Sequence, residues 1–367
     1  MLDLDASRAR QEALRQRAGE NMDAVVVGDS RHVQYLSAAQ PRWLHQAGLL
    51  LDAKGRTLAV WPNSPPGAIA ADEIVCYEAN RFATLTSDHA RQIALRLAEA
   101  MTRPRGAIRI GIDRSAVTAA LQLLLPDADF VSIDEDLLAM RRTKQADELA
   151  MLRRALGACD AMFARARQII EPGVPELHVF NELHAAAVES LGEPMFAPLG
   201  NDYACGVGGG PARAGRVAQA GEIYITDVGP SYRGYFGDAS RALAVDRQPT
   251  DAQLAAWEAI TGVFPIVESM ARVGVRCREI VDAVNAHLLE RAGAALKHHL
   301  GHGIGLQPHE GPHLNPGWDD VLQAGDVIMI EPGVYDPTLR GGMRIENGDH
   351  PTDGGVEKLI HAPLELV

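Results

Sequence analysis

Cysteine is scarce in this sequence. Only four cysteines occur among 367 residues, widely spaced and without a C-x-x-C pair: Cys76, Cys159, Cys205 and Cys277. Disulfide-rich secreted domains and thiolate metal sites both require cysteines at short, regular spacings. We therefore expect reduced thiols that fill the core of a cytoplasmic protein.

Long apolar runs and an excess of positive charge are lacking as well. No apolar stretch approaches the roughly 18 to 20 residues of a membrane span, and the amino terminus has no apolar segment typical of a secretory signal. The net charge of −13 at pH 7 argues against a nucleic-acid partner, because such binding needs basic patches. We interpret the acidity as a contribution to solubility.

What is present is an ordinary globular composition, with 47% hydrophobic and 23% charged residues. Its length favours two domains. The first 140 residues alternate between helical and strand-like patterns, which predicts a mixed α/β sheet. The segments that carry this prediction are a charged helix over Ser7–Glu20, the run "DAVVVG", a hairpin with its turn at Lys54-Gly55, and the strands "AIRIGID" and "DFVSID".

A long helix marks the domain boundary near Thr143. Its apolar residues recur at spacings of three and four and predict one buried face: Leu149, Leu152, Leu156, Cys159, Phe163, Ala166 and Ile170. Strand-like segments follow, together with helices predicted over Glu176–Leu191, Asp251–Val273 and Cys277–Ala292, the second of them with a Thr250/Gln253 capping box. We predict domains at 1–142 and 143–367, the second an α+β domain with a largely antiparallel sheet backed by helices.

Acidic residues interrupt two apolar hairpins of the second domain. Asp227 and Asp238 lie on either side of the turn region Gly229–Gly234, where they could face each other across two strands. Glu331 and Glu346 repeat the arrangement around a longer loop. Four such carboxylates would repel one another and resist burial unless divalent cations relieved the charge. The alternative is four unrelated strand-end acids; two facing pairs favour a site for two metal ions.

Histidine supplies the fifth candidate ligand, in "HHLGHGIGLQPHEGP". His302 lies between Gly301 and Gly303, with His298 before it and His309 after it. Ligation by oxygen atoms and one imidazole suits Mn²⁺, Co²⁺ or Fe²⁺, with Zn²⁺ as an alternative, since no thiolate is present to enforce zinc.

These residues resemble the metal-ligand signature of the pita-bread metallopeptidases, family M24, which include the methionine aminopeptidases, aminopeptidase P, prolidase and creatinase. The matching motifs are "DVGPSYRGYFGDASR", "HHLGHGIGLQPHEGP", "IEPGVY" and "MRIEN". The helix "RRTKQADELAMLRRA" and the first domain resemble the prolidase and creatinase branch, so the resemblance covers essentially the whole chain. It implies a carboxy-terminal pita-bread fold preceded by a smaller α/β domain.

The resemblance also implies roles for single residues. Asp227, Asp238, His302, Glu331 and Glu346 are expected to hold two divalent metals, in this branch usually Mn²⁺, with a bridging hydroxide as the nucleophile.

Glu331 is further expected to relay the proton, His309 to hydrogen-bond the substrate carbonyl or the tetrahedral intermediate, and His298 to line the substrate pocket. Arg344 is expected to orient ligands or bind substrate, with a structural ion pair as its alternative. The branch is commonly homodimeric through the first domain.

One position departs from the family. Peptidases of this fold carry another histidine 17 or 18 residues before the first metal-binding aspartate, where this chain has Gly210 and Gly209. They belong to "GVGGGPARAG", Gly206–Gly215, which matches neither G-x-G-x-x-G nor G-K-[ST] and so is not predicted to bind a nucleotide.

Three hypotheses follow. The chain is a Xaa-Pro dipeptidase or aminopeptidase in which Tyr203 or water covers the missing histidine, a non-peptidase relative such as a C–N hydrolase or lyase, or an inactive binding module. The complete ligand set favours an enzyme, and we predict a metal-dependent Xaa-Pro peptidase.

Overall fold

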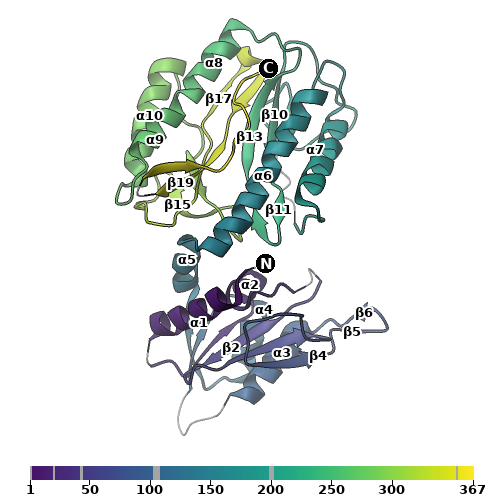
Figure 1. The fold of residues 1–367 in the computed structure, drawn as a ribbon, viewed down its shortest axis with the longest axis vertical. Coiled ribbons are helices and arrows are strands. Elements are labelled where there is room, and N and C mark those ends of the chain that lie inside the picture. Colours follow the sequence, from purple (N-terminus) through teal and green to yellow (C-terminus); the bar gives the residue numbers. More distant parts are fainter. Residues whose placement is uncertain (1, 20, 42–43, 102–107, 198–201, 353) are drawn as a thin grey trace. The chain divides into compact units, whose positions relative to one another are not determined.

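The computed structural model describes residues 2–19, 21–41, 44–101, 108–197, 202–352 and 354–367. Its contacts divide the chain into two compact units, Met1–Arg141 and Arg142–Val367 (Figure 1). No helix among the described residues is long and apolar enough to cross a membrane.

The first unit is built on one mixed six-stranded sheet, in the order β4-β3-β2-β1-β7-β8. The pairs β1–β2 and β2–β3 are antiparallel, whereas β1–β7, β3–β4 and β7–β8 are parallel. The mixed α/β sheet predicted from sequence is thereby confirmed, including the turn at Lys54-Gly55. The strands are β1 (Ala24–Val27), β2 (Gly48–Asp52), β3 (Thr57–Pro62), β4 (Glu73–Tyr77), β7 (Arg109–Ile112) and β8 (Asp129–Ser132).

Helices cover this sheet. α3 (His89–Ala100) and α4 (Ala116–Leu124) bury Ile93, Leu97 and Leu121 in one cluster with the strand residues Val26 and Leu50. The remaining elements of the first unit are α1 (Leu4–Ala18), α2 (Ser30–Ser37), the small hairpin β5 (Asn80–Arg81) with β6 (Thr84–Leu85), and α5 (Asp134–Arg142), which runs to the start of the second unit.

The second unit begins with the long helix α6 (Ala146–Ile169). Six of the seven residues predicted to form its apolar face are buried; Leu149 is only half-buried, and its neighbour Glu148 is buried instead. Glu148 accepts a hydrogen bond from the Tyr235 hydroxyl at 3.1 Å. A carboxylate in the core is tolerated there because it has a hydrogen-bond donor.

The prediction of one continuous helix over Asp251–Val273 is wrong. The structure has α8 (Asp251–Thr261) and then α9 (Val263–Met270), which meet at Gly262. Pro265 lies in the first turn of α9, where its missing N–H costs nothing, but inside a continuous helix it would break the ladder. The predicted capping box is confirmed, since Thr250 N–H donates to Gln253 at 2.9 Å and Gln253 N–H to Thr250 at 3.3 Å.

Antiparallel strands form the middle of the second unit. In Figure 1 they lie between α6 and α7 on one side and α8, α9 and α10 on the other. Two sheets have the orders β13-β10-β9 and β15-β14-β16-β19-β20, and two small hairpins pair β11 with β12 and β17 with β18. All of these pairs are antiparallel, as the sequence predicts.

The further helices of this second unit are α7 (Glu176–Leu191), α10 (Cys277–Ala292) and the short η1 (Pro337–Leu339). The strands are β9 (Tyr203–Cys205), β10 (Ile223–Val228), β11 (Ser231–Tyr232), β12 (Tyr235–Phe236), β13 (Ala239–Ala244), β14 (Gly301–Gly303), β15 (Glu310–Leu314), β16 (Ile328–Ile330), β17 (Gly333–Asp336), β18 (Gly341–Arg344), β19 (Asn347–Thr352) and β20 (Gly355–Lys358).

Candidate metal centre

The two aspartates come from one long hairpin. Asp227 lies in β10 and Asp238 directly precedes β13. The turn is at Arg233-Gly234, both with positive φ, and the register pairs Asp227 with Ser240. The expectation that the two aspartates face each other directly is therefore wrong, because the residue opposite Asp227 is Ser240, two positions after Asp238. They are diagonal neighbours on the same face of the hairpin, where side chains still meet, and their carboxyl groups share a hydrogen bond.

The two glutamates lie opposite each other, between the strand pairs β16–β19 and β17–β18 of the second unit. Ile330 of β16 pairs with Asn347 of β19, and Gly333 of β17 pairs with Arg344 of β18. Glu331 and Glu346 lie between these pairs, one step beyond Ile330 and Asn347, so the shared register sets them opposite each other. The N–H of Glu346 donates to the Ser240 carbonyl at 2.9 Å, which joins this acid pair to the aspartate hairpin.

His302 lies among these carboxylates from β14. Its Nδ1 is 3.0 Å from the Gly303 carbonyl, and its Nε2 is 3.5 Å from Glu331 Oε1 and 3.8 Å from Glu346 Oε1. One ligand atom each of Asp238, His302 and Glu346 lie within 4.8 Å of one another, and all three residues are buried. The contact at Nδ1 fits a tautomer that leaves the Nε2 lone pair directed at the acids.

The electrostatics show a site with excess negative charge. Burial, followed by repulsion from neighbouring carboxylates, raises the pKa of Asp238 and of Glu346 well above their usual values. Burial also raises the pKa of Asp227 to about 6, against the opposing effect of Arg344. Glu346 Oε1 is buried and accepts no hydrogen bond from the residues that the structure describes. Divalent cations fit this donor set, because they would satisfy both the charge and the unpaired oxygen.

Arg344 lies within hydrogen-bond reach of Asp227. Its Nε donates to Asp227 Oδ2 at 3.0 Å, its Nη1 to the Tyr335 hydroxyl at 3.1 Å, and its Nη2 to both Asp202 and Asp227. The side chain is only 12% exposed. These contacts support the ion-pair alternative for Arg344, because they use all three nitrogens of the guanidinium group.

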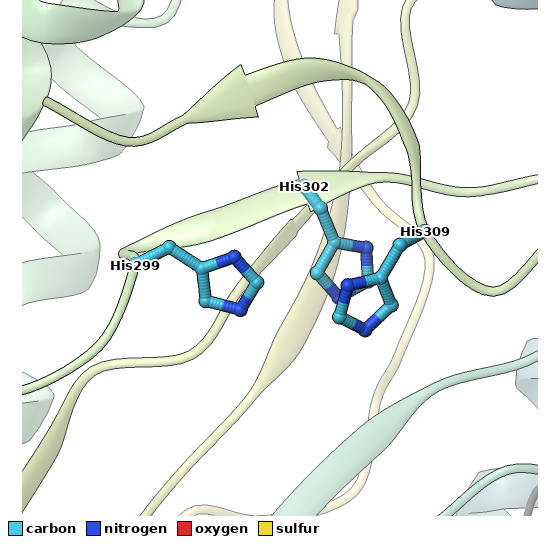
Figure 2. Close-up of side chains that lie close together, drawn as sticks. All are labelled: His299, His302 and His309. Carbon is cyan, nitrogen blue, oxygen red and sulfur yellow. The ribbon is translucent and has the colours of Figure 1, made fainter. Parts of the chain in front are cut away.

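Three further histidines, His298, His299 and His309, lie near Glu331 and His302. His298 Nε2 lies 2.9 Å from the Tyr335 hydroxyl, and the His309 ring stacks on His302 with centroids 3.8 Å apart (Figure 2). His299 Nε2 lies 2.6 Å from Glu331 Oε1. Burial alone would raise the pKa of Glu331, but the hydrogen bond and charge of His299 hold it below its usual value.

Sequence reasoning missed three residues of this site: His299, Tyr335 and Asp202. His299 belongs to the quoted run "HHLGHG", so the presence of a third histidine there was a usable signal. Tyr335 and Asp202 carried no signal of spacing, since their roles depend on contacts with Arg344, distant in the chain.

The glycine-rich segment holds a carboxylate of the protein itself. Gly210 N–H donates to Asp202 Oδ1 at 2.8 Å, and Tyr203 N–H to the Gly210 carbonyl at 2.9 Å. Gly209 and Gly210 have φ of +128° and +127°, and a Cβ on Gly209 would collide with the Asp202 carboxylate. The segment therefore needs glycine at position 209, and the carboxylate of Asp202 occupies the space next to it.

Tyr203 lies beside the aspartates. It is 1% exposed, and its hydroxyl is buried with no hydrogen-bond partner among the described residues. Burial, and then the nearby charge of Asp227, raise the pKa of the phenol, which keeps it protonated at neutral pH. The group is therefore a donor close to the carboxylates.

The chain is similar in sequence and in structure to known peptidases. Residues 150–349 match the metallopeptidase family M24. The chain is 33% identical over 277 residues to the "Probable dipeptidase PepE" of Mycobacterium tuberculosis, covering 69% of each chain. It is 26% identical over 359 residues to the "Xaa-Pro dipeptidase" of Pyrococcus horikoshii, covering 95% of each. The structure matches the prolidase of Pyrococcus furiosus with a TM-score of 0.79 at 21% identity, over 96% of this chain and 99% of that one. The predicted fold, a pita-bread domain after a smaller α/β domain, is confirmed.

Proposed function

We propose that this chain cleaves peptides whose second residue is proline. The chain belongs to metallopeptidase family M24. It is a metal-dependent hydrolase of the dipeptidase or aminopeptidase kind. The preference for proline is supported by relatives that are named as Xaa-Pro dipeptidases, such as that of Pyrococcus horikoshii, which covers 95% of this chain. The other two hypotheses from sequence, a C–N hydrolase or lyase and an inactive binding module, are not favoured by these relatives.

Four buried carboxylates lie close together, and three of them, Asp238, Glu331 and Glu346, approach His302. We propose that Asp227, Asp238, His302, Glu331 and Glu346 hold two divalent cations, with Mn²⁺ preferred over Co²⁺, Fe²⁺ or Zn²⁺ because oxygen donors dominate. When bound, such cations lower the pKa of water so that it attacks at neutral pH, and they polarise the scissile carbonyl.

Glu331 is the proposed proton carrier. Its pKa is held low by His299, so the carboxylate is ionised and able to accept a proton from the attacking water. The same residue can then deliver that proton to the departing amine. His299 acts as a positioning residue, because its Nε2 fixes one oxygen of Glu331 at 2.6 Å.

His309 and His298 are proposed to contact substrate. The His309 side chain is exposed and stacks on His302, so it lies next to the centre and can donate a hydrogen bond to the substrate carbonyl. His298 is oriented by the Tyr335 hydroxyl at 2.9 Å. Arg344 is proposed to hold Asp227 in place instead of binding substrate.

Tyr203 is the proposed substitute for the histidine that the family resemblance implies at Gly209 or Gly210. The phenol stays protonated and has a free donor next to Asp227. A location in the cytoplasm, supported by four free cysteines, and a homodimer formed through the first unit remain parts of this proposal.

Turnover of a matched peptide series tests the function. Full-length protein loaded with Mn²⁺ is assayed on Xaa-Pro dipeptides, on longer peptides with the same two first residues, and on the Xaa-Ala equivalents. We expect cleavage of the proline peptides alone, abolished by a chelator and restored by Mn²⁺. Bound metal without turnover of any peptide would contradict the peptidase proposal, and equal cleavage of Xaa-Ala would contradict the preference for proline.

A further inference from the structure

Three histidine rings lie together next to the carboxylates. His299 precedes β14, His302 lies in it, and His309 precedes β15; Figure 2 shows the three side chains close to one another. The His299 ring centroid is 5.4 Å from those of His302 and His309. One ring nitrogen of each histidine lies within 4.8 Å of the others. Three imidazole nitrogens at this spacing are close enough together to coordinate one metal ion once the stacked rings of His302 and His309 turn towards it.

This set differs in chemistry from the carboxylate centre. The imidazole set (His299, His302 and His309) is made of nitrogen donors and touches the carboxylate of Glu331, whereas the predicted carboxylate centre has four acids and one imidazole, His302. Imidazole ligands suit Zn²⁺ and Cu²⁺, and the affinity of such sites rises steeply from Mn²⁺ to Cu²⁺. Oxygen-rich sites suit Mn²⁺ much better. The two sets therefore differ in the cations that their donor atoms suit.

His302 belongs to both sets, and it has one nitrogen to give. Its Nδ1 contacts the Gly303 carbonyl at 3.0 Å, so Nε2 must serve either set. Entry to the imidazole set is open on one side, since His309 is exposed and His299 is half-buried.

We propose that His299, His302 and His309 form a second metal site, which binds one Cu²⁺ or Zn²⁺ ion and competes with the carboxylate centre for His302. The site itself stands on its own geometry, whereas the inhibition that follows from it rests on the proposed function. Binding of a nitrogen-preferring cation withdraws His302 from the acids and occupies His309. Excess Zn²⁺ or Cu²⁺ should then inhibit the protein, while excess Mn²⁺ should not.

Copper titration of the full-length chain, freed of metal by chelation, tests the site. Electron paramagnetic resonance of the first equivalent of Cu²⁺ reports the number of coordinating nitrogens. We expect several nitrogens in the natural protein and fewer in His299→Asn, with an affinity for that equivalent at least about tenfold lower, since even the loss of an outer-shell partner costs that much. His309→Asn should show the same loss, and it serves as the second variant if His299→Asn does not fold.

His178→Asn is the matched control, because His178 is an exposed histidine on α7. Its copper spectrum and affinity should equal those of the natural protein. If His299→Asn and His309→Asn, folded by circular dichroism, bind copper with unchanged affinity and nitrogen number, the site is refuted.

Mn²⁺ binding and Xaa-Pro cleavage, measured on the same preparations, separate the two proposals. Absence of cleavage with an intact copper signature would count against the proposed function only, and would still support the site. Cleavage with a copper signature that does not depend on His299 and His309 would overturn the site only.

Discussion

Two glutamates of the second unit have equally buried side chains, but their pKa values are shifted in opposite directions. Glu176 is 0% exposed and Glu346 is 1% exposed. Glu176 accepts hydrogen bonds from the side chain of Arg213 and from the N–H groups of Cys205 and Arg213, and these contacts outweigh burial and lower its pKa. Glu346 has other carboxylates as neighbours, its pKa is raised, and its Oε1 has no hydrogen-bond partner among the described residues.

The comparison separates two uses of a buried carboxylate. Where the chain supplies its own cation, as Arg213 does for Glu176, the acid is a structural element. Where the described residues gather several acids next to one another, as around Glu346, a bound cation is expected to supply the balancing charge.

The largest effect is expected for Asp238→Asn. The change keeps the size of the side chain but removes one negative charge of the carboxylate centre. We expect Mn²⁺ affinity and Xaa-Pro cleavage to fall by more than about 100-fold, because loss of a direct ligand exceeds the loss of an outer-shell partner. Asp319→Asn is the control, since that aspartate forms an exposed ion pair with Arg276. Retention of metal by Asp238→Asn would show that the ligands are misassigned.

The pH dependence of stability should differ with and without metal. A pKa raised in the folded state means that the native protein binds more protons, so stability falls as pH rises through the folded value. Asp227, with a pKa raised from 3.8 to about 6, should stabilise chelated protein as pH falls from about 6 towards 4. Urea unfolding at a series of pH values measures this, and bound Mn²⁺ should remove the dependence. Glu176 has the opposite effect on stability. Its pKa is lowered in the folded state, so the protein loses stability when the pH falls towards that lowered pKa and Glu176 becomes protonated.

Arg213→Ala should destabilise the protein without affecting the metal centre. It leaves Glu176 buried without its cation, which costs about 2 to 3 kcal/mol in the free energy of unfolding, less than for a fully buried pair because Arg213 is 39% exposed. Arg276→Ala, which breaks the exposed pair with Asp319, should change it by less than about 1 kcal/mol. Chemical denaturation compares the two. Loss of bound Mn²⁺ in folded Arg213→Ala would contradict the separation of the two regions.

The smallest effect is expected in the glycine-rich segment. Gly210→Ala places a side chain in open space at φ +127°, so it measures backbone strain alone, of about 1 kcal/mol. Gly209→Ala adds a collision with Asp202, the partner of Arg344, and should cost more stability and also lower activity. Denaturation and turnover of the two variants give the difference. Equal activity of both variants would mean that Asp202 does not help to hold Arg344.

The sequence predicts what depends on local pattern and fails where contacts between distant residues decide. The helices predicted over Glu176–Leu191 and Cys277–Ala292 agree with α7 and α10. The offset between Asp227 and Asp238 depends on the choice of Arg233-Gly234 as the turn, which the alternation of the strands does not determine. The contact of His299 with Glu331, and that of Asp202 with Arg344, depend on tertiary packing and were missed.

Metal content per chain tests the central claim most directly. The full-length protein is saturated with Mn²⁺, freed of unbound metal by gel filtration, and measured by elemental analysis beside Asp238→Asn and Asp319→Asn. The carboxylate centre predicts about two Mn²⁺ per chain in the natural protein and in Asp319→Asn, with a clear loss in Asp238→Asn. Natural protein without Mn²⁺, or Asp238→Asn with the full amount, would contradict the claim that these acids form a metal site.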